Sequence, residues 1–249
     1  MKPNYEIIGN GEGTIVFVHY FGGDAGSWKW LTKRLKRKHR CVLLNLPGFG
    51  NTTALKEPSI YDFSKYIIQC IKYLKLKNYT LCGHSMGAKL ALYATKLMVD
   101  NRPSKIILIA PSPPTTENMS GEEKSRMLNH PDKEEAKTTV EGAIVKNLGK
   151  KRYDYAVDSQ LRIDERTWDW WLEQGMEHNI ADRIKGLDIP TFIIYSKNDP
   201  VIDTDSIYNE VLPYLNLPSV IALGNIGHLI PMEAPRKLAR QIKRITKNG

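Results

Sequence analysis

Residues 83–87 have the order Gly-His-Ser-Met-Gly, and their types and spacing suit nucleophilic chemistry. An apolar, strand-like run at residues 79–82 precedes them, and a helix-forming sequence at residues 88–93 follows. When G-x-S-x-G joins a strand to a helix, the tight turn projects the serine hydroxyl from the sheet edge, and the glycines let backbones approach closely. We therefore predict that Ser85 is a catalytic nucleophile.

A serine hydroxyl needs a general base near neutral pH, and histidine, with an ordinary pKa of about 6.5, suits that role. Six histidines compete for it. We select His228 because it lies in a glycine-rich loop after the last strand-like run, at the carboxyl edge of the expected sheet. We expect His84 and His19 to support neighbouring loops, and we carry His178 forward as a substrate contact.

A carboxylate must hold the base in one tautomer, and Asp199 is the predicted partner of His228. Asp199 follows the apolar run at residues 191–196 and precedes His228, which gives the chain order Ser, Asp, His. Asp203 and Asp205 lie further along the chain, where we expect them to cap a helix instead.

Acyl transfer also requires donors for a developing oxyanion, and two backbone N–H groups are candidates. Met86 is expected at the amino terminus of a helix, where free N–H groups and the helix dipole stabilise negative charge. The second donor is expected in the loop that follows residues 14–19. We assign it to Phe21, with Tyr20 as the adjacent alternative.

Short apolar, β-branched runs alternate with segments of helical periodicity, which indicates a mostly parallel sheet flanked by helices. Residues 61–76, for example, place apolar side chains three to four positions apart, as an amphipathic helix requires. The expected fold class is therefore α/β. The strand-like runs are residues 14–19, 41–46, 79–82, 105–110, 191–196 and 219–223.

The alternation stops between residues 111 and 188, where a proline-containing loop leads into a charged, helix-prone stretch. A connection of this length is better explained by a small helical cap than by a structureless loop. We predict a core domain of residues 1–110 and 189–249, with a cap at residues 111–188. Trp168, Trp170 and Trp171 have the spacing of residues that pack a helix onto a core, but Trp168 and Trp171, with Tyr20, are also substrate-pocket candidates.

Composition excludes several other classes of protein. No apolar run approaches the roughly 18 residues of a membrane-spanning helix. The net charge is +9, but the basic stretch at residues 33–40 lacks interleaved aromatic side chains, so we expect neither a nucleic-acid nor a membrane partner. The odd set of Cys41, Cys70 and Cys82 lies in or beside apolar runs, which favours buried free thiols over disulfides or metal ligands. We expect a cytoplasmic monomer or homodimer without a cofactor.

Taken together, the motifs resemble the α/β-hydrolase fold superfamily, in its capped serine esterase and cofactor-free haloperoxidase-like branch. The resemblance implies the α/β-hydrolase fold and a cap inserted after the strand that ends near Ala110. One position departs from the pattern: Tyr20 follows His19 where many relatives carry glycine, which narrows the oxyanion entrance or reshapes the acyl pocket. The matching segments are residues 19–23 with Trp28, residues 46–50, the turn at 83–87, Asp199-Pro200 and Gly227-His228.

The predicted activity is hydrolysis of a small, hydrophobic ester through an acyl-enzyme on Ser85. The same three residues could instead support perhydrolysis or halide-dependent peroxidation, carbon–carbon bond hydrolysis, a lyase reaction or a slow-turnover ligand receptor. Dehalogenases and epoxide hydrolases of this fold use an aspartate nucleophile, so a serine at position 85 argues against both.

Overall fold

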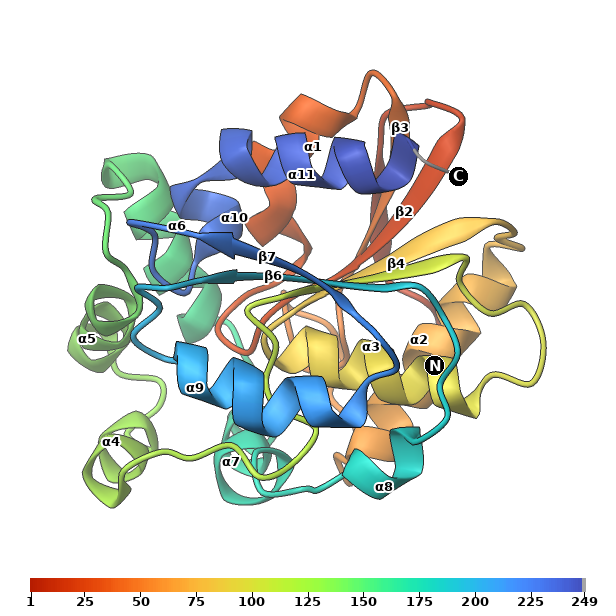
Figure 1. Cartoon of the computed structure of the whole chain (residues 1–249). Helices are drawn as coiled ribbons and strands as arrows, with labels where there is room; N and C mark the ends of the chain where they lie inside the picture. Colours follow the sequence, from red (N-terminus) through yellow and green to blue (C-terminus); the bar gives the residue numbers. More distant parts are fainter. Residues whose placement is uncertain (248–249) are drawn as a thin grey trace.

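The computed structural model describes residues 1–247, in which seven strands form one sheet of order β1-β3-β2-β4-β5-β6-β7 (Figure 1). All neighbouring strands are parallel except β1, which is antiparallel to β3. This arrangement confirms the predicted α/β fold with a mostly parallel sheet. The strands are β1 (Tyr5–Ile8), β2 (Gly13–Val18), β3 (His39–Leu44), β4 (Tyr79–His84), β5 (Lys105–Ile109), β6 (Thr191–Ser196) and β7 (Ser219–Leu223).

The central strands are apolar on both faces because helices cover both sides of the sheet. Every residue of β4 is buried, and in β5 only Lys105 is partly exposed. Figure 1 shows α1 and α11 on one side of the sheet and α2 and α3 on the other. The helices of this core are α1 (Lys29–Leu35), α2 (Ile60–Tyr73), α3 (Met86–Leu97), α9 (Thr204–Ser206), α10 (Ile230–Glu233) and α11 (Pro235–Lys247), with short 3₁₀ or π turns at 25–28 and 207–214.

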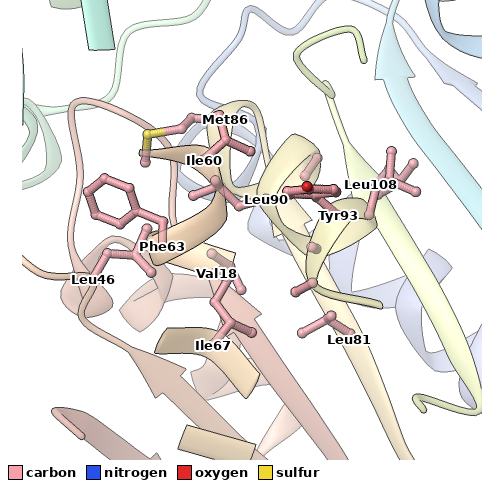
Figure 2. Packing of buried hydrophobic residues seen from close by; sticks show 14 of the residues in the cluster. Val18, Leu46, Ile60, Phe63, Ile67, Leu81, Met86, Leu90, Tyr93 and Leu108 are labelled. Carbon is pink, nitrogen blue, oxygen red and sulfur yellow. The ribbon is translucent and has the colours of Figure 1, made fainter. Parts of the chain in front are cut away.

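The amphipathic helix predicted from residues 61–76 is α2. Ser59 caps its first turn by accepting a hydrogen bond from the Asp62 N–H at 3.0 Å, which satisfies one of the free donors there. Its apolar stripe, including Phe63 and Ile67, packs against α3 and the sheet (Figure 2). This packing fixes α3, the helix that begins directly after the predicted nucleophile.

The structure has an edge strand, β1, that the sequence analysis did not predict. Its alternation is weak, since Glu6 and Ile7 are both exposed, and it pairs with a neighbour on one side only. The other runs are found within two residues of the expected bounds. Cys41, Cys70 and Cys82 are buried free thiols, as predicted.

Between β5 and β6 the chain forms a series of helices, which we call the insertion (residues 111–188). In Figure 1 its helices α4, α5 and α6 lie beyond the end of the sheet at which β6 and β7 finish. No helix in the described part of the chain is long and apolar enough to cross a bilayer. The insertion contains α4 (Gly121–Met127), α5 (Lys133–Ala143), α6 (Lys150–Leu161), α7 (Glu165–Trp170), a π turn at Trp171–Gly175 and α8 (Ala181–Ile184).

Candidate active site

Ser85 occupies the sharp turn between β4 and α3. Its backbone angles, φ 52° and ψ −122°, lie in a region that non-glycine residues rarely adopt, at a cost of about 1–3 kcal/mol. The Ser85 N–H donates to the Ile109 carbonyl at 3.0 Å, which ties the turn to the end of β5. The fold therefore holds Ser85 in a strained conformation at the carboxyl edge of the sheet.

The glycines on either side of Ser85 are needed for close backbone packing. A Cβ atom at Gly83 would lie 2.3 Å from the Gly87 carbonyl oxygen. A Cβ at Gly87 would lie 2.4 Å from the carbonyl oxygens of Val18 and His19, at the end of β2. Because these neighbours are backbone atoms, a side chain at either position would displace the turn.

His228 and Asp199 meet at the same edge of the sheet. The imidazole Nδ1 lies 2.9 Å from Asp199 Oδ2, and both residues are buried. The other oxygen of Asp199 accepts from the N–H groups of Val201 at 2.9 Å and Ile202 at 3.0 Å, which fixes the carboxylate. The His228 N–H donates to the Ala143 carbonyl of the insertion at 2.7 Å. Asp203 instead caps α9 through the Ser206 N–H, as predicted.

Ser85 and His228 line one cavity, together with residues of the insertion. The Ser85 hydroxyl lies 3.4 Å from the Ser112 hydroxyl, and the described residues show no hydrogen bond from Ser85 to His228. In ligand-free enzymes such catalytic hydrogen bonds are often long and shorten when substrate binds. Ser85 and His228, the predicted nucleophile and base, thus share one cavity, and Asp199 lies behind His228.

The electrostatic surroundings of His228 favour its protonated form. Burial alone would lower its pKa, but the charge and hydrogen bond of Asp199, with smaller contributions from Glu117 and Glu233, raise the pKa above its ordinary value. The imidazolium that would form when His228 takes a proton is therefore stabilised where it forms.

Two further histidines support the loops, as expected. The His19 Nδ1–H donates to the Tyr20 carbonyl at 2.9 Å, while its Nε2 accepts from the Leu46 N–H at 3.2 Å. Burial lowers the pKa of His19 to about 4, so it stays neutral. His84 Nε2 donates to the His228 carbonyl at 2.9 Å, and burial keeps its pKa well below the ordinary value. Both uncharged rings therefore hold backbone groups of neighbouring loops in place.

The cavity has a volume of about 120 Å³ and a mostly apolar wall. Tyr20, Phe21, Trp168 and Trp171 all line it, and the Phe21 and Trp168 rings stack with centroids 4.3 Å apart. Trp170 faces away and packs on Phe63 of α2, so it belongs to the core. Met119, Met127, Val140, Ala143, Val201 and Leu229 complete most of the apolar wall.

His178 is not brought to the cavity, and its prediction as a substrate contact is wrong. It is exposed, lies outside the cavity wall and stands between the π turn at Trp171–Gly175 and α8. Burial is slight there, and together with the charges of Lys89 and Arg183 it lowers the His178 pKa. In residues 1–247 no three histidine, cysteine or carboxylate side chains are grouped as metal ligands.

The insertion also holds the loop that carries Phe21. Ser159 of α6 donates to the Gly22 carbonyl at 2.8 Å, and Arg162 forms an ion pair with Asp24 at 3.0 Å. Tyr155 donates a further hydrogen bond to Asp24. Burial opposes ionisation of Asp24, yet the hydrogen bonds from Tyr155 and Arg162 hold its pKa below the ordinary value. Helix α6 therefore fixes the loop in which an oxyanion donor is predicted.

Sequence reasoning missed three polar residues of this site: Ser112, Glu117 and Gln160. Ser112 follows β5, so its place at the carboxyl edge of the sheet was a usable signal. Glu117 and Gln160 reach the cavity only through the folding of the insertion. No motif in the sequence marks either one.

Residues 13–247 match the family described as the alpha/beta hydrolase fold, and the chain belongs to that family. A pimeloyl-[acyl-carrier protein] methyl ester esterase of Legionella pneumophila (strain Corby) is 27% identical over 75% of this chain and 76% of its own length. The 2-hydroxy-6-oxo-6-(2'-aminophenyl)hexa-2,4-dienoic acid hydrolase of Metapseudomonas resinovorans is 22% identical over 96% of this chain and 85% of its own.

Some curated relatives match over a shorter stretch. Karrikin insensitive 2 receptor B of Petunia hybrida is 33% identical, but the match covers 44% of this chain and 42% of that protein. Among solved structures, an esterase from Exiguobacterium antarcticum superimposes with a TM-score of 0.88 over 99% of this chain and 96% of its own, at 17% identity. That likeness shows a shared fold.

The raised pKa of His228 predicts the pH dependence of Ser85 reactivity. Only neutral His228 can accept the serine proton, so labelling of Ser85 by a small fluorophosphonate should lose rate as pH falls, with a midpoint above the ordinary value of about 6.5. Asp199→Asn should lower both the midpoint and the rate, the latter by on the order of 10³-fold. Labelling rates measured from pH 5 to 9 test this, and a wild-type midpoint at or below 6.5 would contradict it.

The contacts of α6 predict a second effect on the same reaction. Arg162→Ala removes the ion pair that fixes Asp24, so the Phe21 loop should loosen and labelling of Ser85 should slow by about tenfold, because small misplacements weaken catalysis. Lys150→Ala is the matched control, since it breaks an exposed ion pair with Asp154 on the same helix. Thermal melting verifies folding; equal labelling rates in folded Arg162→Ala and wild type would refute the role of α6.

Proposed function

We propose that the protein is a serine hydrolase that cleaves carboxylic esters through an acyl-enzyme on Ser85. The observation that carries this proposal is the 2.9 Å contact between His228 Nδ1 and Asp199 Oδ2, beside a cavity that also holds Ser85. That contact leaves Nε2 of His228 free to act as a base. Similarity to the methyl ester esterase of Legionella pneumophila over 75% of this chain also supports ester hydrolysis.

In the proposed mechanism the Ser85 oxygen attacks the ester carbonyl while His228 takes the hydroxyl proton. The carbonyl oxygen becomes an oxyanion, to which the N–H groups of Phe21 and Met86 donate. Collapse breaks the bond to the alcohol, which leaves with the proton from His228. Water then attacks the acyl-enzyme with the same base, and the acid is released while Ser85 recovers its proton. Asp199 stabilises the imidazolium in both halves.

The size of the cavity favours a short acyl or alcohol group. Its volume of about 120 Å³ is well below the roughly 300–1,000 Å³ of pockets that hold drug-sized ligands. The wall formed by Phe21, Trp168 and Trp171 favours apolar carbon at most positions. Larger substrates would require the insertion to move, as lids do in other enzymes.

Carbon–carbon bond hydrolysis is the alternative with a specific relative, the dienoic acid hydrolase of Metapseudomonas resinovorans. That protein's substrate carries a carboxylate, for which an enzyme normally supplies arginine or lysine. Within residues 1–247 neither residue type lines this cavity. We therefore favour ester hydrolysis. A ligand receptor, as in the Petunia match, would show turnover far below about 1 s⁻¹ on every ester.

A chain-length series of p-nitrophenyl esters tests the proposal. Turnover should be highest for acyl chains of about two to four carbons and fall steeply for longer ones, because the cavity is small. Ser85→Ala should lower kcat by at least about 10⁴-fold. Initial rates for both proteins, with Asp203→Ala as a control outside the site, provide the measurement. Wild-type rates retained in Ser85→Ala would overturn the proposal.

A further inference from the structure

The charge of the cavity wall is opposite in sign to that of the chain. The protein carries a net charge of +9, yet the described residues around the cavity include two glutamates, Glu117 and Glu123, and neither lysine nor arginine. A charge at an enclosed, apolar site acts on a ligand far more strongly than one at an exposed surface. The residues of the wall therefore favour substrates of one charge over another.

The two glutamates differ in their ion pairs within residues 1–247. Glu123 forms an ion pair with Arg126 at 2.5 Å, so its charge is balanced outside the cavity. Within residues 1–247 Glu117 has no such ion pair, and its Oε2 atom is buried without a hydrogen-bond partner. The nearby ammonium of Lys89 donates instead to the carbonyls of Thr115 at 2.9 Å and Met176 at 3.3 Å.

Glu117 is close to the reacting groups. Ser112 is near enough to Glu117 to lower the pKa of its carboxyl, and the Ser112 hydroxyl lies 3.4 Å from the hydroxyl of Ser85. Burial raises the pKa of Glu117, and Ser112 and Lys89 partly offset that effect. The Glu117 charge also helps to raise the pKa of His228. A substrate bound at Ser85 must therefore lie within the field of this carboxylate.

Gln160 of α6 supplies a second acceptor in the same wall. Its side chain is 2% exposed, and its Oε1 atom is buried without a hydrogen-bond partner among the described residues. Its Nε2 donates to the Ala136 carbonyl at 3.4 Å, so turning the amide around would place two oxygens against each other. The carbonyl end of the amide is therefore the end without a hydrogen-bond partner among the described residues. A buried acceptor without a partner costs about 1–3 kcal/mol unless a donor satisfies it.

We propose that Glu117 and Gln160 select esters that carry a hydrogen-bond-donating ammonium or hydroxyl group, and that Glu117 excludes esters that carry a carboxylate. This inference rests on the proposed esterase activity and names its substrate class. The apolar wall holds the carbon chain, the two acceptors bind the donor, and like-charge repulsion at Glu117 rejects anions. Glu117 is in this account a specificity-determining residue.

Three ethyl esters that differ only at the far end of the acyl chain test the proposal: ethyl butanoate, ethyl 3-aminopropanoate and monoethyl succinate. These carry a methyl, an ammonium and a carboxylate group at matched positions. The acetates of choline and 3,3-dimethylbutanol, which differ only in charge, examine the alcohol side. Acid release at about pH 7.5, where the succinate carboxyl is ionised and the aminopropanoate amine is protonated, gives kcat/KM for each.

For the wild type we expect monoethyl succinate to have a kcat/KM at least about 100-fold below that of ethyl butanoate. The kcat/KM of ethyl 3-aminopropanoate should exceed that of ethyl butanoate. Glu117→Gln should raise the anionic-to-neutral ratio by about tenfold and lower the cationic-to-neutral ratio. Glu122→Gln is the matched control, because it removes the same charge from an exposed position on α4, outside the cavity. It should leave both ratios unchanged.

The outcomes distinguish this inference from the proposed function. Equal hydrolysis of the anionic and neutral esters by wild type, or unchanged ratios in Glu117→Gln, would overturn the role of Glu117 and leave the esterase intact. If none of the five esters is hydrolysed, or if Ser85→Ala hydrolyses them at the wild-type rate, the proposed function fails instead. Because the wild-type ratios are measured first, the test does not depend on the variant folding.

Discussion

The left-handed backbone at Ser85 is the constraint on which the rest of the site depends. A serine at φ 52° is stable only if neighbouring backbone holds it there, and here the Ile109 carbonyl, the end of β2 and the first turn of α3 do so. The close approach of Gly83 and Gly87 to other backbone atoms permits this packing. The packing of the parallel strands thus offsets the strain in this one residue. The Ser85 hydroxyl lies at the same edge of the sheet as His228 and Asp199.

The insertion contributes to the site in two ways. It supplies Trp168 and Trp171 to the cavity wall, and through α6 it holds the loop that carries Phe21. Because Arg162 binds Asp24 in that loop, displacement of α6 to admit a substrate would also disturb a predicted oxyanion donor. One helix therefore lines the cavity through Gln160 and also holds the loop of the predicted oxyanion donor.

The fold and the main chemical groups could be predicted because their signals are local. The apolar runs indicate strands, and the pattern around Ser85 and the positions of Asp199 and His228 after later strands follow from the chain order. The edge strand β1 was missed because its exposure pattern is irregular. Contacts such as Arg162 with Asp24 join residues 138 positions apart, and Glu117 and Gln160 reach the cavity by tertiary packing alone. His178 lies in coil outside the cavity, and nothing in the sequence shows which part of the insertion faces that cavity.

The central claim is that Ser85 carries the acyl group during turnover. Rapid acid quenching of the reaction with p-nitrophenyl butanoate, followed by peptide mass spectrometry, examines it most directly. The account predicts one butanoyl group on the peptide that contains Ser85, formed within the first turnover and absent from Ser85→Ala. A butanoyl group on the neighbouring Ser112 instead, or steady turnover with the Ser85 peptide never acylated, would contradict it.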